Sequence, residues 1–205
     1  MRQQKTIMIK IFFQGDSITD AGRDRSDNHL LAGFTRCTKE LLGEQFEYVN
    51  YGISGDTSRS VIRRHEQEFL KEKPDILVLL IGINDVWRNV DHIEKEMTTS
   101  EEFLENVKKI VEISKKINPL VKLIFLEPFL TPGSSNVYEL GFDLYKTNIG
   151  LARKYIKPIV DQYIVLQDYI YSKHQKGEDL TRDGVHPNDE GEKYLAKIVA
   201  DVARK

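Results

Sequence analysis

The run DILVLLIG, residues 75–82, contains six consecutive apolar side chains with no polar residue among them. A strand that faces water on one side alternates apolar and polar residues along its length. A run without alternation is typical of a strand covered on both faces, as in a parallel sheet flanked by helices. This one segment therefore indicates a central strand of a parallel sheet.

Other short blocks rich in β-branched and aromatic residues accompany this run, and segments with helical periodicity lie between them. We predict further strands at 6–13, 46–52, 121–128 and 162–168, and helices at 32–44, 57–71, 100–117, 138–156 and 189–204. Strands that alternate with helices at this spacing imply right-handed crossovers. The expected fold is α/β, a three-layer α/β/α sandwich with a doubly wound five-stranded parallel sheet of the flavodoxin-like type.

The chain has 205 residues and shows no internal repeat, low-complexity tract or Pro/Gly/Ser linker. A chain of this length commonly forms one domain, so we expect a single domain over 1–205. The stretch FLTPGSSNVYELG, residues 129–141, is the most loop-like part and is a candidate mobile flap over a binding site.

The bulk properties exclude several classes of partner. The net charge is −2, with 30 basic and 32 acidic residues, so we expect neither nucleic-acid nor anionic-membrane binding. No apolar stretch is long enough to span a membrane, and residues 1–13 do not resemble a signal peptide, so a cytoplasmic location is expected. Cys37 is the only cysteine, which rules out an intrachain disulfide and a cysteine zinc cluster, and we expect a buried thiol there. The sequence leaves a homo-oligomer open.

The predicted fold also predicts where a ligand binds. In open parallel sheets, ligands lie beyond the carboxyl ends of the strands. The segments that follow the first four strands are GDS, GISGDTS, GINDVWR and EPF, and three of them are rich in glycine and small polar residues. We therefore expect the functional site to form from these segments.

Ser17 follows the first strand, and a serine hydroxyl needs a neighbouring base to become a nucleophile. The best candidate is His186 in LTRDGVHPNDEG, because Asp183 precedes it by three residues. On a tight loop that aspartate can hydrogen-bond one ring nitrogen and leave the other for a serine. The remaining histidines lie among charged or polar residues, where we expect solvated positions: His29, His65, His92 and His174.

Acyl transfer also needs hydrogen-bond donors directed at the oxyanion of the tetrahedral intermediate. Gly55 can bring a backbone N–H close to a ligand, and Asn84 can offer its side-chain amide. Each residue has an ordinary alternative, a turn glycine for Gly55 and a strand-end cap for Asn84. Their occurrence at different strand ends together with Ser17, Asp183 and His186 favours a catalytic site.

The segments FFQGDSITD, NYGISGDTS, IGIND and DGVHP occur in this order and resemble the four sequence blocks of the SGNH (GDSL-type) hydrolases. The resemblance runs from residue 12 to 187. It implies the SGNH hydrolase fold, with Ser17 as nucleophile, His186 as general base and Asp183 as its orienting acid. It further implies an oxyanion hole made by the Ser17 and Gly55 N–H groups and the Asn84 amide. A serine esterase of this kind requires no metal or organic cofactor.

The segment GINDVWRNVD, residues 82–91, is similar to the corresponding stretch of intracellular acetylxylan esterases in this family. This similarity implies a small-molecule ester substrate with a short acyl group, acetyl, on a sugar. Trp87 and Arg88 are candidate substrate contacts; alternatively, Trp87 packs in the core and Arg88 pairs with a carboxylate. Asp16 is a further candidate contact, although we expect it mainly to hold the turn before Ser17.

Alternatives remain at this point. A lysophospholipase or an acyl-thioesterase of the same family would use the same residues, with a groove under residues 129–141 for a longer acyl chain. A flavodoxin-like small-ligand binding module would share the fold, although it would leave Asp183 and His186 without a function. Ser54 does not fit the Gly-x-Ser-x-Gly pattern, and HEQEF, residues 65–69, lacks the second histidine of a zinc site.

Overall fold

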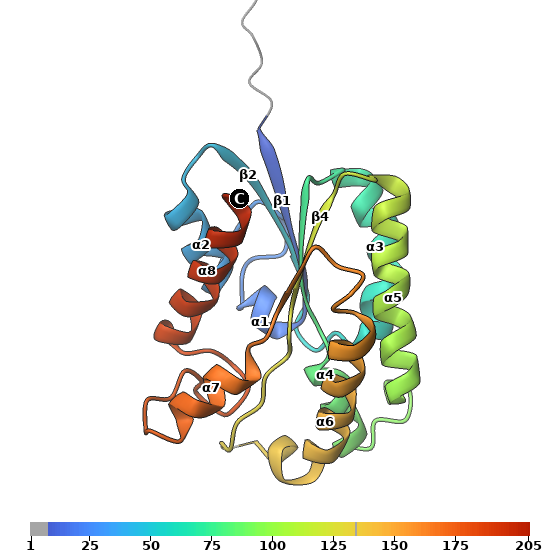
Figure 1. The fold of residues 1–205 in the computed structure, drawn as a ribbon, viewed down its shortest axis with the longest axis vertical. Coiled ribbons are helices and arrows are strands. Elements are labelled where there is room, and N and C mark those ends of the chain that lie inside the picture. Colours follow the sequence, from blue (N-terminus) through green and yellow to red (C-terminus); the bar gives the residue numbers. More distant parts are fainter. Residues whose placement is uncertain (1–7, 134) are drawn as a thin grey trace, which may run out of the picture.

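A computed structural model of the chain describes residues 8–133 and 135–205. Within these residues, five parallel strands form one sheet in the order β2-β1-β3-β4-β5, which confirms the doubly wound arrangement (Figure 1). The strands are β1 (Ile9–Gly15), β2 (Phe46–Gly52), β3 (Ile76–Leu80), β4 (Lys122–Leu126) and β5 (Gln162–Ile164). Residues 6 and 7 of the first predicted strand lie outside the described residues.

Helices cover both faces of this sheet, as the sequence predicts (Figure 1). Helices α2 and α8 pack on each other on one face, and α3 and α5 pack on each other on the opposite face. The helices described are α1 (Ser17–Asp20), α2 (Gly33–Leu42), α3 (Ser58–Glu72), α4 (Ile83–Val90), α5 (Ser100–Ile117), α6 (Val137–Tyr155), α7 (Gln167–His174) and α8 (Asp189–Ala203).

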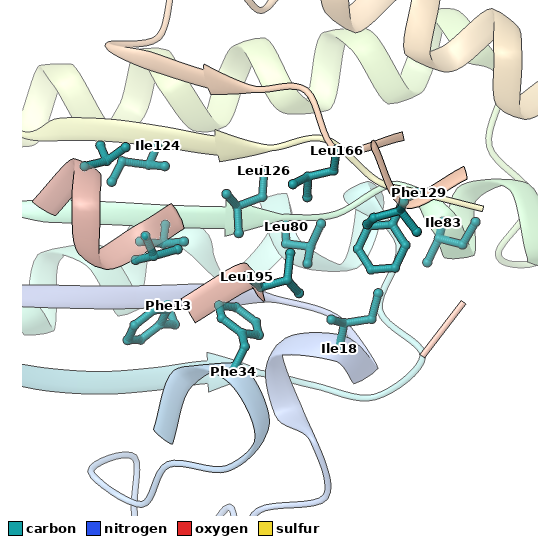
Figure 2. Close-up of a cluster of buried hydrophobic side chains, with 14 of the residues drawn as sticks. Phe13, Ile18, Phe34, Leu80, Ile83, Ile124, Leu126, Phe129, Leu166 and Leu195 are labelled. Atoms are coloured by element: carbon teal, nitrogen blue, oxygen red, sulfur yellow. The ribbon is translucent and has the colours of Figure 1, made fainter. Parts of the chain in front are cut away.

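The central strand β3 shows why its sequence has no polar alternation. Ile76, Val78 and Leu80 belong to the hydrophobic cluster under α2 and α8, part of which Figure 2 shows. Leu77 and Leu79 belong to the cluster on the opposite face, under α3 and α5. Successive side chains of a strand point to opposite faces, so both sets must be apolar when helices cover both faces.

Three helices were not expected from the sequence. Helix α4 begins two residues after β3, and its apolar residues Ile83, Val86 and Trp87 follow helical spacing over only eight residues. Helix α1 is a single turn, and α7 buries only Ile170. The predicted strand 162–168 ends at Ile164, and so α7 lies between the last strand and the segment that carries His186.

The first three residues of the stretch 129–141 are packed in the protein interior. Phe129, Leu130 and Thr131 are buried, and α6 begins at Val137. The Thr131 N–H donates to the carbonyl of Gly184 at 2.9 Å. Residues 137–141 form the start of α6, in agreement with the helix predicted at 138–156; Ser134 lies outside the described residues.

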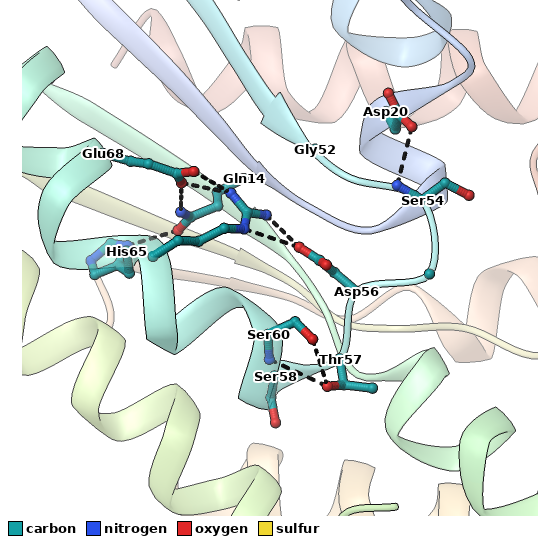
Figure 3. Close-up of polar contacts among 12 residues, drawn as sticks. Gln14, Asp20, Gly52, Ser54, Asp56, Thr57, Ser58, Ser60, His65 and Glu68 are labelled. Atoms are coloured by element: carbon teal, nitrogen blue, oxygen red, sulfur yellow. Dashed lines mark hydrogen bonds and ion pairs between the residues drawn. The ribbon is translucent and has the colours of Figure 1, made fainter. Parts of the chain in front are cut away.

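Two further expectations concern single residues. Cys37 is buried, as predicted. The solvated position expected for His65 is wrong, because its side chain is fully buried between β1 and α5 (Figure 3). Its Nδ1 lies 2.7 Å from Gln14 Oε1 and its Nε2 lies 2.9 Å from Ser114 Oγ. Among the residues that the structure describes, no helix is long and apolar enough to cross a membrane.

Candidate active site

Ser17 lies at the point where the sheet reverses its winding order. Strand β1 pairs with β2 on one side and with β3 on the other, so the chain segments that follow these strands diverge here. Asp16 caps α1 by accepting a hydrogen bond from the Ile18 N–H at 3.0 Å. Ser17 is therefore the first residue of α1, at an end where backbone N–H groups have no partner within the helix.

Asp183 and His186 lie on a tight turn between α7 and α8. Thr181 and Pro187 form an antiparallel bridge, and the Arg182 N–H donates to the His186 carbonyl at 2.8 Å. Within the turn, Asp183 Oδ1 accepts from the backbone N–H groups of Val185 at 3.0 Å and His186 at 2.8 Å. This leaves Oδ2 of Asp183 free to contact the His186 ring, 2.7 Å from Nδ1.

Gly184 lets this turn pack closely against the segment that follows β4. Its φ is +93°, in the region that disfavours side chains, and a Cβ added there would lie 2.3 Å from the Thr131 carbonyl oxygen. Together with the hydrogen bond from Thr131 to the Gly184 carbonyl, this contact fixes the position of the turn.

The structure brings Ser17, His186 and Asp183 together. Ser17 Oγ lies 2.9 Å from His186 Nε2, although the two residues are 169 positions apart in the chain. Burial raises the pKa of Asp183, but the hydrogen bonds from His186 and from the Val185 N–H outweigh it and bring the pKa below its ordinary value. Asp183 is therefore ionised at neutral pH and can stabilise a positive charge on the imidazole.

In the loop of residues 54–56, between β2 and α3, each residue has one backbone group hydrogen-bonded to a side chain from another element. The Ser54 N–H donates to Asp20 Oδ2 at 3.1 Å (Figure 3). The Gly55 carbonyl accepts from the Arg88 guanidinium at 3.3 Å, and the Asp56 carbonyl accepts from the Asn84 side-chain amide at 3.0 Å.

The side chain of Asp56 ties the same loop to α3. Its carboxylate accepts from Arg64 at 2.6 and 3.1 Å, and Arg64 also contacts Glu68 (Figure 3). Gly55 has φ +88°, and a Cβ there would lie 2.7 Å from the Arg88 guanidinium. A side chain at position 55 would therefore displace both the loop and Arg88.

The three candidate substrate contacts lie in different surroundings. Asp16 is 1% exposed and caps α1, so its carboxylate does not face a substrate. Arg88 forms an ion pair with Glu96 at 2.9 Å, which agrees with the alternative that it pairs with a carboxylate. Trp87 packs against the hydrophobic cluster under α2 and α8, with its ring centroid 6.2 Å from that of His186.

Two buried carboxyl groups lie near the site: Asp16, which was expected to hold the turn before Ser17, and Asp85, for which the sequence suggested no role. Asp85 is fully buried and accepts hydrogen bonds from the Ser58 N–H at 2.9 Å and hydroxyl at 2.5 Å, so it anchors the start of α3. Burial, together with the nearby carboxylates of Asp56 and Asp85, raises the pKa of Asp16 to about 7. Their positions in the motifs GDS and IND were visible in the sequence, but their burial was not.

An open cleft of about 340 Å³ lies beside Ser17 and His186. It extends past Asp20 and Ser54 to Arg182 and Glu192 at the start of α8. A larger groove of about 600 Å³ lies along α2 and α8, but neither Ser17 nor His186 lines it. The smaller cleft is therefore the one that gives access to the Ser17 hydroxyl.

The chain is similar to known proteins over most of its length. Residues 13–194 match the GDSL-like lipase/acylhydrolase family. The chain is 30% identical over 203 residues to an acetylxylan esterase from Geobacillus stearothermophilus, covering 92% of this chain and 90% of that enzyme. A structure described as a GDSL-like lipase from Parabacteroides merdae has a TM-score of 0.84 at 27% identity, covering 94% of each chain.

Structures of the Geobacillus enzyme also superpose on this chain. One of them is a catalytic mutant with a serine replaced by alanine, with a TM-score of 0.75 at 28% identity, covering 96% of this chain and 95% of that one. Its fold is that of the doubly wound sheet described above. The chain therefore belongs to the GDSL-like lipase/acylhydrolase family and is a carboxylic ester hydrolase.

Proposed function

We propose that this protein is a serine esterase that removes acetyl groups from carbohydrate, with Ser17, His186 and Asp183 as its catalytic triad. The observation that carries the proposal is the chain of contacts from Ser17 Oγ to His186 Nε2 at 2.9 Å and from His186 Nδ1 to Asp183 Oδ2 at 2.7 Å. Both contacts lie within hydrogen-bonding distance, and the cleft leaves Ser17 open to an ester.

In the first step, His186 Nε2 accepts the Ser17 proton while Oγ attacks the ester carbonyl. Asp183 holds Nδ1 protonated and stabilises the imidazolium that forms. The imidazolium then gives its proton to the leaving alcohol oxygen, and the acyl group remains on Ser17. Water, deprotonated by His186, releases the carboxylic acid and restores the Ser17 hydroxyl.

We assign the oxyanion hole to the backbone N–H groups of Ser17 and Gly55 and to the Asn84 amide. The position of Ser17 at the start of α1 supports this assignment, because N–H groups there have no partner within the helix. Gly55 and Asn84 belong to one bonded unit, since Asn84 donates to the carbonyl of Asp56, the residue after Gly55. Donors fixed in this way need no rearrangement when the negative charge develops.

Acetyl on carbohydrate is the substrate class that the comparisons favour, because the Geobacillus relative is an acetylxylan esterase. The cleft at Ser17 is about 340 Å³ and open, and carboxylates of Asp20 and Glu192 line it. These charged groups oppose the binding of an apolar group in the cleft. The lysophospholipase and acyl-thioesterase alternatives are decided by the test with esters of different chain length.

The test is hydrolysis of 4-nitrophenyl esters from two to twelve carbons and of acetylated xylo-oligosaccharides. We expect the acetyl ester to be preferred, and Ser17→Ala to abolish turnover. Ser54→Ala is the matched control, because Ser54 lines the same cleft. Labelling with a fluorophosphonate should modify Ser17 alone. Undiminished activity in Ser17→Ala would refute the nucleophile assignment, and a preference for long acyl chains would refute the acetyl assignment.

A further inference from the structure

The cleft beside Ser17 extends on the histidine side of the proposed triad. His186 and Pro187 line it. Arg182 also lines it, and its backbone N–H donates a hydrogen bond to the His186 carbonyl. Ser17 lines it beside His186, whereas Gly55 and Asn84, the other two proposed oxyanion donors, are absent from its lining. In acyl transfer, the leaving alcohol takes its proton from the histidine. The cleft therefore lies where the leaving group, rather than the acyl group, is bound.

The far end of the cleft carries an ion pair between Arg182 and Glu192. The Arg182 guanidinium donates to Glu192 Oε1 at 3.1 Å. The Glu192 side chain is only 14% exposed, whereas that of Arg182 is 61% exposed. A guanidinium has five N–H donors and a carboxylate can accept about four hydrogen bonds, so one contact between them leaves most of this capacity available.

The chemistry of this lining matches hydroxyl groups. Of the ten residues that line the cleft, six have polar or charged side chains: Ser17, Asp20, Ser54, Arg182, His186 and Glu192. Each hydroxyl of a sugar both donates and accepts, so it can donate to a carboxylate and accept from a guanidinium. An apolar alcohol would remove water from the same groups without replacing those hydrogen bonds.

We propose that Glu192 and Arg182 form a leaving-group subsite that recognises the free hydroxyl groups of a partly acetylated sugar. The proposal rests on the proposed esterase function. Glu192 accepts a hydrogen bond from one sugar hydroxyl, and Arg182 donates to another. When the ester bond breaks, the sugar oxygen next to His186 takes the proton from Nε2, and the free sugar leaves through the open end of the cleft.

The test compares two substrates of similar size. One is a monoacetylated methyl xyloside with two free hydroxyls, and the other is cyclohexyl acetate, whose ring has none. Hydrogen bonds to charged groups contribute about 1.5–3 kcal/mol, roughly tenfold to a hundredfold in kcat/KM. We expect Glu192→Gln and Arg182→Gln to lower kcat/KM for the xyloside at least tenfold more than for cyclohexyl acetate, mainly through KM.

Glu190→Gln is the matched control, because Glu190 lies on the same helix and pairs with Lys193 at the surface. This variant should hydrolyse both substrates at the wild-type rate. Equal losses on both substrates in Glu192→Gln and Arg182→Gln would overturn the subsite, since the pair would then act only on the fold of the His186 turn. Unchanged kinetics on the xyloside would also overturn it. If the wild-type protein hydrolysed neither ester, the proposed function itself would fail.

Discussion

Replacing Asp183 by asparagine tests the proposed triad, because it should move the proton of the neutral His186 ring from one nitrogen to the other. Asp183 Oδ1 accepts two backbone N–H groups, from Val185 at 3.0 Å and His186 at 2.8 Å. An asparagine must place its side-chain oxygen at the position of Oδ1. In the opposite orientation its NH₂ group would face these two backbone N–H donors. That orientation would lose two hydrogen bonds, each contributing roughly 0.5–1.5 kcal/mol. The asparagine NH₂ must therefore face His186 Nδ1, where Asp183 Oδ2 lies at 2.7 Å.

The consequence is a change of tautomer. With an N–H donor facing it, Nδ1 of His186 must accept, so the ring proton moves to Nε2. Nε2 lies 2.9 Å from Ser17 Oγ and can then no longer accept the serine proton. In serine proteases the same substitution lowers kcat by about 10⁴, equivalent to about 5.4 kcal/mol in the barrier. We expect a loss of that order, with little change in KM.

The assay is steady-state hydrolysis of a chromogenic acetyl ester, together with thermal unfolding. Asp183→Asn should keep nearly the wild-type melting temperature, because its oxygen retains both backbone contacts. Asp179→Asn is the control, since Asp179 contacts His174 Nδ1 at 2.6 Å at the surface. It should leave kcat within about twofold of wild type, as is usual for an exposed pair. Wild-type turnover in Asp183→Asn would refute the proposed role. The role would also be refuted if the double variant lost residual activity beyond that of Ser17→Ala alone, because residues of one triad do not add.

Four other perturbations follow from the structure. Asn84→Ala should lower kcat about 10²–10³-fold with little effect on KM, as measured with an acetyl ester, and an unchanged kcat would remove Asn84 from the oxyanion hole. Burial and the Arg64 charge lower the pKa of His65 to about 4. The unfolded chain therefore binds a proton that the native state excludes as the pH falls from about 6.5 to 4, which costs up to about 3 kcal/mol of stability. Urea unfolding at several pH values should therefore show that the difference in unfolding free energy between wild type and His65→Gln changes by up to this amount over that range. The raised pKa of Asp16, about 7, has the opposite effect. The native state keeps a proton that the unfolded chain loses, so stability falls as the pH rises from about 4 to 7, by up to about 4 kcal/mol. Asp16→Asn should therefore be more stable than wild type at pH 8, and equal stability there would contradict a protonated Asp16. Gly184→Ala should lower both the melting temperature and kcat. Gly177 is the control, because it also has positive φ but no atom lies within 4 Å of an added Cβ. Gly177→Ala should lower only the melting temperature, and by less than Gly184→Ala does.

The strands of this fold could be predicted because covered parallel strands have a distinctive composition. Ile76–Leu80 is apolar throughout, and a strand covered by helices on both faces buries all of these side chains. The ends of these strands then predict where Ser17, Gly55 and Asn84 lie. The approach of Asp183 to His186 was also predictable, because three residues on a tight turn keep both side chains on one side of it.

The rest depends on contacts between distant parts of the chain. His65 lies among charged residues in the sequence, yet Gln14 and Ser114, 51 and 49 positions away, provide its buried partners. Arg88 has no local signal that selects Glu96 and the Gly55 carbonyl over a substrate. Helix α4 was missed because it is short and begins shortly after β3, so the pattern of GINDVWR indicates only a polar segment that follows the strand.

The contact between Ser17 and His186 joins the first strand to the segment just before the last helix. Helix α8 in turn packs on α2, near the beginning of the chain. A nascent chain therefore cannot form the proposed Ser17–His186 pair until residues 181–203 have been synthesised and α8 has docked. Under the proposed mechanism, catalytic turnover or labelling of Ser17 reports this docking. Both signals would be lost if the segment from Thr181 to α8 were released, even with the sheet intact.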